Sequence, residues 1–131
     1  MHVVSLYASI LALLFVALSI RTLRMRRSLK IAIGDAGNQA MLRAMRVHSN
    51  FAEYVPLSLL LIYFVEASEA HSVFVHILGV CMLVGRASHA FGVSQVEENY
   101  TFRVFGMAMT FTVLVTAALY LLIRYLIKVG A

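Results

Sequence analysis

Two long apolar segments without charges lie near the two ends of the chain. Val3–Ile20 contains 18 uncharged residues and Val104–Ile123 contains 20. At a rise of about 1.5 Å per residue, each forms a helix about 27–30 Å long, which matches the hydrocarbon core of a bilayer. The pattern therefore predicts two transmembrane helices.

Two shorter apolar runs occupy the middle of the chain. Tyr54–Val65 and Val73–Val84 contain 12 residues each, and runs of this length can also be interfacial or re-entrant segments. The first spans a bilayer only if its helix extends back toward Arg46, and the second only if its helix continues to about Val93. Because the connections are short and four crossings accommodate every apolar run, we favour four full spans.

The composition supports a membrane protein of one domain. Hydrophobic residues make up 62% and charged residues 13% of the chain, and the mean hydropathy is +0.88. An average soluble domain has roughly 45–50% and 25%, so a small soluble enzyme is a poor interpretation. The fold class predicted is all-α, a transmembrane four-helix bundle over residues 1–131. Cys81 has no second cysteine to pair with and is expected to be a packed thiol, and the histidines lack metal-ligand spacing.

The charge distribution predicts how the bundle is oriented. The net charge is +5, and six of the 11 basic residues lie between Arg21 and Arg43, directly after an apolar run. This placement indicates a membrane surface rather than nucleic acid, and positive-inside reasoning places the segment in the cytoplasm. The connection 66–71 has no lysine or arginine, which suits the opposite side. Both termini are then expected outside the cytoplasm.

A turn is expected between the first two spans. Gly34-Asp-Ala-Gly-Asn38 combines two glycines with Asp and Asn, which bond readily to nearby backbone. Asn38 is also a good N-cap residue, so we expect the second helix to begin near Gln39.

The second span carries polar residues on one narrow face. Arg46, Asn50 and Glu53 are spaced i, i+4, i+7, which places them within about 60° of one another on a helix. A charge near the bilayer centre costs about 2.5–3.5 kcal/mol on insertion scales, so such residues normally face protein or water. His48 points to roughly the opposite side.

Further polar residues on the third and fourth helices are expected at the same depth. Arg86 and His89 share one side of the third helix, and Arg103 precedes the fourth. Together with the face of the second helix they would hold an anionic molecule that also offers an amine, because arginines bind carboxylates with paired donors. The alternatives are an Arg46–Glu53 ion pair that only joins helices or subunits, snorkelling of Arg86 and His89, and an interfacial anchor at Arg103.

Proline at position 56 lies inside the second predicted helix. It removes one backbone hydrogen bond and clashes with the carbonyl of Ala52. The consequence is either a kink that widens the site or a tolerated membrane proline, which is common.

The second helix carries a motif that resembles the signature of a known family. The pattern is Arg46-x-x-x-Asn50-x-x-Glu53-Tyr54-x-Pro56, followed on the third helix by Gly85-Arg86-x-x-His89. It is similar to the MAPEG family, the membrane-associated proteins in eicosanoid and glutathione metabolism, over nearly the whole chain. Gly34-Asp35-x-Gly37-Asn38 looks most like the bacterial members, which implies a bacterial inner membrane.

The resemblance implies an assembly, a cofactor and a reaction. It implies a homotrimer that binds glutathione at subunit interfaces toward the cytoplasmic leaflet, with lipophilic electrophiles arriving from the membrane. The glutathione-binding residues implied are Arg46, Asn50, Glu53, Tyr54, Arg86 and His89. Arg103 matches a catalytic arginine that stabilises the glutathione thiolate, which is the nucleophilic form of a thiol. The expected function is a transferase or peroxidase.

Three positions depart from the family's enzymes. Val93 stands where they often carry a tyrosine, Ser49 where some have a basic residue, and Met107 where some have a polar residue. A non-catalytic lipid-binding or scaffold protein of the same fold is therefore the alternative. A small drug transporter is disfavoured because Val3–Ile20 lacks the acidic residue that such a transporter needs.

Overall fold

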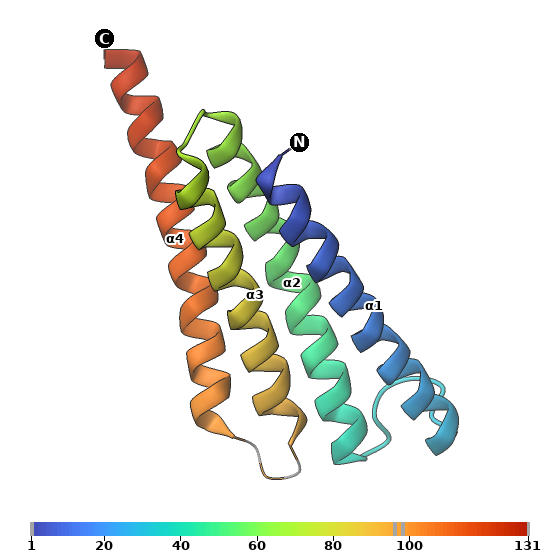
Figure 1. Ribbon diagram of the computed structural model, residues 1–131. Helices are drawn as coiled ribbons and strands as arrows, with labels where there is room; N and C mark the ends of the chain where they lie inside the picture. Colours follow the sequence, from blue (N-terminus) through green and yellow to red (C-terminus); the bar gives the residue numbers. More distant parts are fainter. Residues whose placement is uncertain (1, 96, 98, 131) are drawn as a thin grey trace.

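Four helices form the part of the chain that the computed structural model describes, residues 2–95, 97 and 99–130. They are α1 (Val3–Leu29), α2 (Gln39–Ala67), α3 (Ser72–Ser94) and α4 (Tyr100–Gly130). Each is long and apolar enough to cross a membrane. The helices run side by side, with the α1–α2 and α3–α4 connections at one end and the α2–α3 connection at the other (Figure 1).

The two short apolar runs lie within long continuous helices, as the four-span interpretation requires. Tyr54–Val65 is part of the 29-residue α2, and Val73–Val84 is part of the 23-residue α3, which ends one residue after Val93. The interfacial or re-entrant alternative is therefore wrong. Pro56 does not interrupt α2, because the bonds before and after it continue the helix.

The turn between α1 and α2 confirms the expectation from its residue types. The Asn38 side chain accepts a hydrogen bond from the Met41 N–H at 3.0 Å, and α2 begins at Gln39. The Asp35 carboxylate accepts from the Gly37 N–H at 3.1 Å. Gly34 and Gly37 both have positive φ, 69° and 74°, a conformation that glycine adopts without strain.

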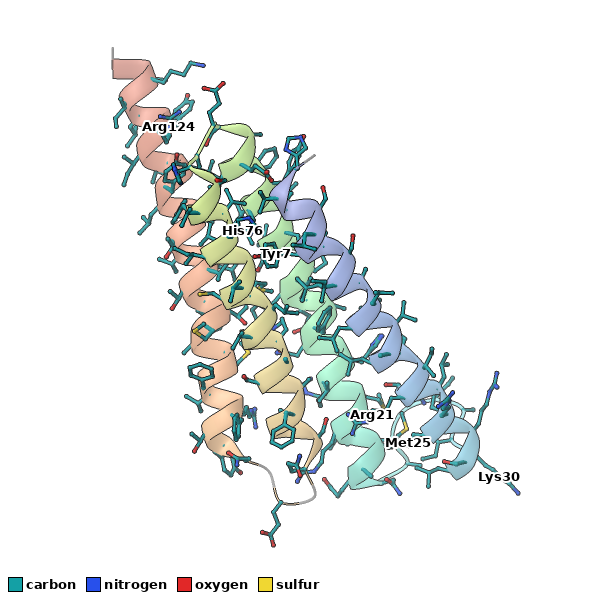
Figure 2. All side chains as sticks on the ribbon, in the orientation of Figure 1. Tyr7, Arg21, Met25, Lys30, His76 and Arg124 are labelled. Carbon is teal, nitrogen blue, oxygen red and sulfur yellow. The ribbon has the colours of Figure 1, made fainter. Side chains whose placement is uncertain are left out.

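Apolar side chains fill the interior and also cover the outside of the bundle. Fully buried residues come from all four helices, including Leu11, Ile62, Val75, Met82 and Ala117, and Cys81 packs against this core as expected. Large apolar side chains on every helix face outward, a pattern typical of lipid contact. Figure 2 shows these side chains projecting along the whole length of the helices.

The start of α1 is capped by a residue of α2. His2 makes no side-chain cap and the first turn of α1 has no acidic residue. Glu66 supplies the cap instead: its carboxylate accepts from the Val3 N–H at 2.5 Å and from the Val4 N–H at 3.0 Å. A negative charge here also interacts favourably with the positive end of the helix dipole. This contact joins two ends that are more than 60 residues apart in sequence.

We expect Glu66→Gln to lower the free energy of unfolding by about 1 kcal/mol, because the cap loses its charge and one acceptor oxygen. Thermal unfolding in detergent micelles, followed by circular dichroism, measures the change. Glu69→Gln is the matched control, since Glu69 is exposed in the connection after α2. Equal unfolding temperatures for the two variants would contradict the capping role.

Candidate functional site

Helices α3 and α4 approach closely because glycines face each other across their contact. A Cβ atom at Gly106 would lie 2.5 Å from the Gly85 carbonyl oxygen and 2.6 Å from the His89 nitrogen, and one at Gly85 would lie 2.9 Å from Met109 Cβ. Small residues at such contacts allow backbones to approach. The approach brings His89 of α3 next to the first turns of α4.

A third glycine places the first turn of α4 beside the end of α3. A Cβ atom at Gly92 would lie 2.7 Å from the Arg103 nitrogen and 2.9 Å from the Asn99 carbonyl oxygen. The Asn99 N–H donates to the Gly92 carbonyl at 3.1 Å, and the Asn99 side chain accepts from the Phe102 N–H at 3.2 Å. Asn99 thus caps α4, and this cap fixes Arg103 one turn into the helix.

The polar residues of three helices meet around one cavity of about 90 Å³. Its lining consists of Arg46, Asn50 and Glu53 from α2, His89 and Val93 from α3, and Arg103 from α4. Its lining residues come from the halves of α2, α3 and α4 nearest the α1–α2 and α3–α4 connections, which lie at one end of the bundle. Five of the six polar residues expected to converge therefore line one cavity, and the sixth, Arg86, does not line it.

Arg86 does not line this cavity but contacts Asn50, which does, and it is called the floor of the site below. Its side chain is 1% exposed, so the snorkelling interpretation is wrong for it, and also for His89, which is 5% exposed. One Nη atom donates to the Asn50 side-chain oxygen at 2.6 Å, and the other donates to the Met107 sulfur at 3.4 Å. The Arg86 guanidinium thus joins α2 and α4 through α3.

The buried guanidinium has further unusual surroundings. Its central carbon lies 5.8 Å from the centroid of the Tyr54 ring, a cation–π distance. Its Nε is buried without a hydrogen-bond partner among the described residues, and no carboxylate of those residues forms an ion pair with it. An anion near this floor would therefore be stabilised by a charge that the protein itself leaves uncompensated.

The rim of the cavity is charged and accessible. Arg46, Glu53 and Arg103 are all exposed. Within the described part of the chain Arg46 and Glu53 form no ion pair with each other, so the interpretation of this pair as glue between helices is wrong within one chain. Three guanidinium groups and one carboxylate give the cavity and its floor a formal charge of +2.

Tyr54 and Met107 lie beside the cavity rather than in its lining. The Tyr54 ring packs edge-on against Phe111 of α4, with centroids 5.6 Å apart, next to the Arg86 guanidinium. Met107 replaces a polar residue, yet its sulfur accepts the Arg86 hydrogen bond. The sequence identifies Met107 as a departure but does not predict this contact with Arg86. The available signal was the one-turn spacing between Arg103 and Met107, which places both residues on one face of α4.

Residues on the opposite side of α2 face α1. The Nε2 atom of His48 lies 3.0 Å from the Ser19 hydroxyl oxygen, and the His48 ring stacks on Phe15 with centroids 4.8 Å apart. Both contacts agree with the direction predicted for His48. Pro56 lines an apolar hollow between α1 and α2, with Leu11 and Val55. The proline therefore lines that hollow and is not a lining residue of the polar cavity.

The sequence matches the MAPEG family model over residues 4–123. The chain belongs to the MAPEG family. It is similar to the inner membrane protein YecN of Escherichia coli strain K12, with 34% identity over 115 residues, 88% of this chain and 86% of that protein. The inner membrane protein YecN of E. coli O6:H1 strain CFT073 matches with the same identity and coverage. The MAPEG-like motif of α2 thus supplies half of the cavity lining, Arg46, Asn50 and Glu53.

We expect Gly106→Ala to lower the free energy of unfolding of this MAPEG protein by about 1–3 kcal/mol, the usual cost of overpacking. The added methyl group would collide with the backbone at Gly85 and His89 and push α4 away from α3. Thermal unfolding in micelles measures the change. Gly130→Ala is the control, because nothing lies within 4 Å of a Cβ atom there. If the two variants unfold at the same temperature, the close helix contact is not what sets the geometry.

Proposed function

We propose that this protein binds glutathione in the polar cavity and acts as a membrane transferase or peroxidase on lipophilic electrophiles. The observation that carries the proposal is the meeting of Arg46, Asn50, Glu53, His89 and Arg103 around one cavity above the buried Arg86. MAPEG membership supports the same ligand, since the family is concerned with glutathione metabolism.

The charges of the ligand and the cavity are complementary. Glutathione carries two carboxylates, one ammonium group and one thiol, so its thiolate form has a net charge of −2. The cavity and its floor carry +2. In this proposal the arginines bind the carboxylates with paired hydrogen bonds, Glu53 accepts from the ammonium group, and Asn50 contacts either group.

Arg103 is the residue proposed to act on the sulfur. A cation beside a thiol lowers its pKa below the ordinary value of about 8.5, and the thiolate is the reactive form. The sulfur then forms a bond to an electrophilic carbon of the acceptor, and the leaving group departs with the electron pair of the bond that breaks. Exposed Phe102, Val104 and Phe105 flank Arg103 on α4, and they offer an apolar approach from the lipid phase.

The size of the cavity argues that a second copy of the chain completes the site. A volume of about 90 Å³ holds about three waters, whereas pockets for small ligands usually have about 300–1,000 Å³. Glutathione would therefore extend beyond the rim formed by Arg46, Glu53 and Arg103. A homotrimer with the site at the subunit interface would enclose the remainder.

The location proposed is a bacterial inner membrane. The four long apolar helices and the similarity to the inner membrane protein YecN support it. With the basic segment Arg21–Arg43 in the cytoplasm, the polar cavity faces the cytoplasmic leaflet and both termini lie outside the cytoplasm.

One observation favours a second candidate, a non-catalytic lipid-binding or scaffold protein. Val93 lines the cavity with an apolar side chain where a tyrosine hydroxyl stands in many enzymes of the family. A site that lacks this donor still binds the peptide part of glutathione. The second candidate predicts no turnover with any lipophilic electrophile.

We expect the wild-type protein to bind glutathione in isothermal titration calorimetry and to show the ultraviolet absorbance of a bound thiolate at neutral pH. Arg103→Gln removes the cation, so the thiolate absorbance should disappear, while the affinity falls by no more than about tenfold. Arg27→Gln, which removes one exposed charge of α1 outside the cavity, is the control.

The outcomes separate the two candidates. No measurable affinity of the wild type for glutathione overturns the proposed ligand. Binding without a thiolate, and without conjugation of a panel of lipophilic electrophiles, favours the scaffold. Saturable conjugation that Arg103→Gln abolishes supports the enzyme.

A further inference from the structure

A second, larger cavity of about 560 Å³ lies between α1, the beginning of α2 and the end of α3. Arg21 and Met25 of α1, Gln39, Ala40 and Arg43 of α2, and Ser94 of α3 contribute to its lining. No lining residue is shared with the cavity around Arg46 and Arg103. Its volume lies within the range of about 300–1,000 Å³ that is usual for ligand pockets.

Two guanidinium groups give this second cavity its charge. Arg21 and Arg43 are both half-buried, and no carboxylate among the described residues forms an ion pair with either. One Nη of Arg21 donates to the Ser94 hydroxyl at 2.5 Å, which holds the side chain between α1 and α3. The two arginines therefore present positive charge to the cavity without an acidic partner among the described residues, an arrangement that favours an anion.

The first residues of α2 line the same cavity. Gln39 and Ala40 are the first two residues of α2, and their N–H groups precede the first hydrogen bond within the helix. The Asn38 side chain satisfies the next N–H group, that of Met41, at 3.0 Å. The positive end of the α2 dipole thus adds to the positive charge of the Arg21 and Arg43 guanidinium groups.

The position of Arg21 in the membrane suggests the source of the anion. The uncharged segment of α1 ends at Ile20, so Arg21 stands at the boundary between hydrocarbon and headgroups. Arg21 and Met25 also border a neighbouring hollow along α1, which Ala17 and Ile20 continue toward the membrane interior. Figure 2 shows Arg21 and Met25 on the part of α1 beside α2, whereas Lys30 extends away from the bundle.

We propose that this cavity binds the phosphate group of an anionic phospholipid. Arg21 and Arg43 bind the phosphate oxygens, the first N–H groups of α2 face the same oxygens, and an acyl chain lies along Ala17 and Ile20 of α1. A phosphate diester bears a negative charge that two arginines and a helix N-terminus attract, and the adjoining hollow, which Ala17 and Ile20 extend toward the membrane interior, distinguishes a lipid from a free anion.

The test titrates the full-length protein in detergent micelles with dioleoylphosphatidylglycerol and measures retained lipid by native mass spectrometry. We expect the double variant Arg21→Gln/Arg43→Gln to bind this lipid at least about tenfold more weakly than the wild type, because two charge-assisted contacts are lost. Arg43→Gln alone, which leaves the Arg21–Ser94 bond in place, should lose affinity in the same direction and remain folded.

The control is Arg27→Gln/Lys30→Gln, which removes the same charge from exposed positions of α1 and should change the affinity less than about twofold. Equal losses in the two double variants would mean general surface attraction and would overturn the site. Retention of dioleoylphosphatidylcholine as strong as that of the anionic lipid would overturn the charge argument. Binding of inorganic phosphate as tight as that of the lipid would assign the cavity to a free anion instead.

Discussion

The arrangement of the polar site depends on one buried cation, the guanidinium of Arg86. It lies on α3 and donates to Asn50 of α2 and to Met107 of α4, so one side chain links three helices. A buried charge without a carboxylate partner is costly in an apolar bundle. The cost is reduced by the Asn50 and Met107 acceptors and the Tyr54 ring, and further reduced when an anion occupies the cavity above.

The two ends of the bundle satisfy their backbone groups in different ways. At the end with the α2–α3 connection, His71 caps α3 locally, and side chains of other helices satisfy two further termini: Glu66 caps the start of α1, and Arg124 of α4 donates to the Ser68 carbonyl at 2.8 Å, directly after α2. At the opposite end, Asn38 and Asn99 are local caps of α2 and α4. The cations Arg21, Arg43, Arg46 and Arg103 lie at this second end, where they line the two cavities.

Local rules were enough to predict the elements of the fold. The Asn38 cap and the start of α2 at Gln39 followed from residue type alone, because a cap involves atoms only three residues apart. The polar face of α2 followed from helical periodicity, and the same periodicity correctly turned His48 away toward α1. Helical periodicity sets the direction in which a side chain leaves its helix. Polar side chains of α2, α3 and α4 do meet around one cavity.

Contacts between distant segments were the part that sequence reasoning missed. Whether Arg86 is buried or snorkels depends on how closely α3 approaches α4, which the Gly85–Gly106 contact sets and which no single helix reveals. The Glu66 cap of α1 joins residues 63 positions apart. For Pro56 the sequence left open a kink that widens the site or a tolerated membrane proline, because the hollow that Pro56 lines with α1 is known only after packing.

The glycines between α3 and α4 allow the charge of Arg86 to be shielded from lipid. A cation at the depth of Arg86 must be kept from lipid, and a 1% exposed side chain requires that backbone and side chains surround it closely. Gly85 and Gly106 permit that closeness immediately beside Arg86, and Gly92 permits it again at the start of α4. The same close contact leaves no space for a larger side chain between α3 and α4, and α2 packs beside it with Arg46, Asn50 and Glu53 in the cavity lining. The close packing that seals the buried charge thus accompanies a cavity of which α2 supplies half of the lining residues.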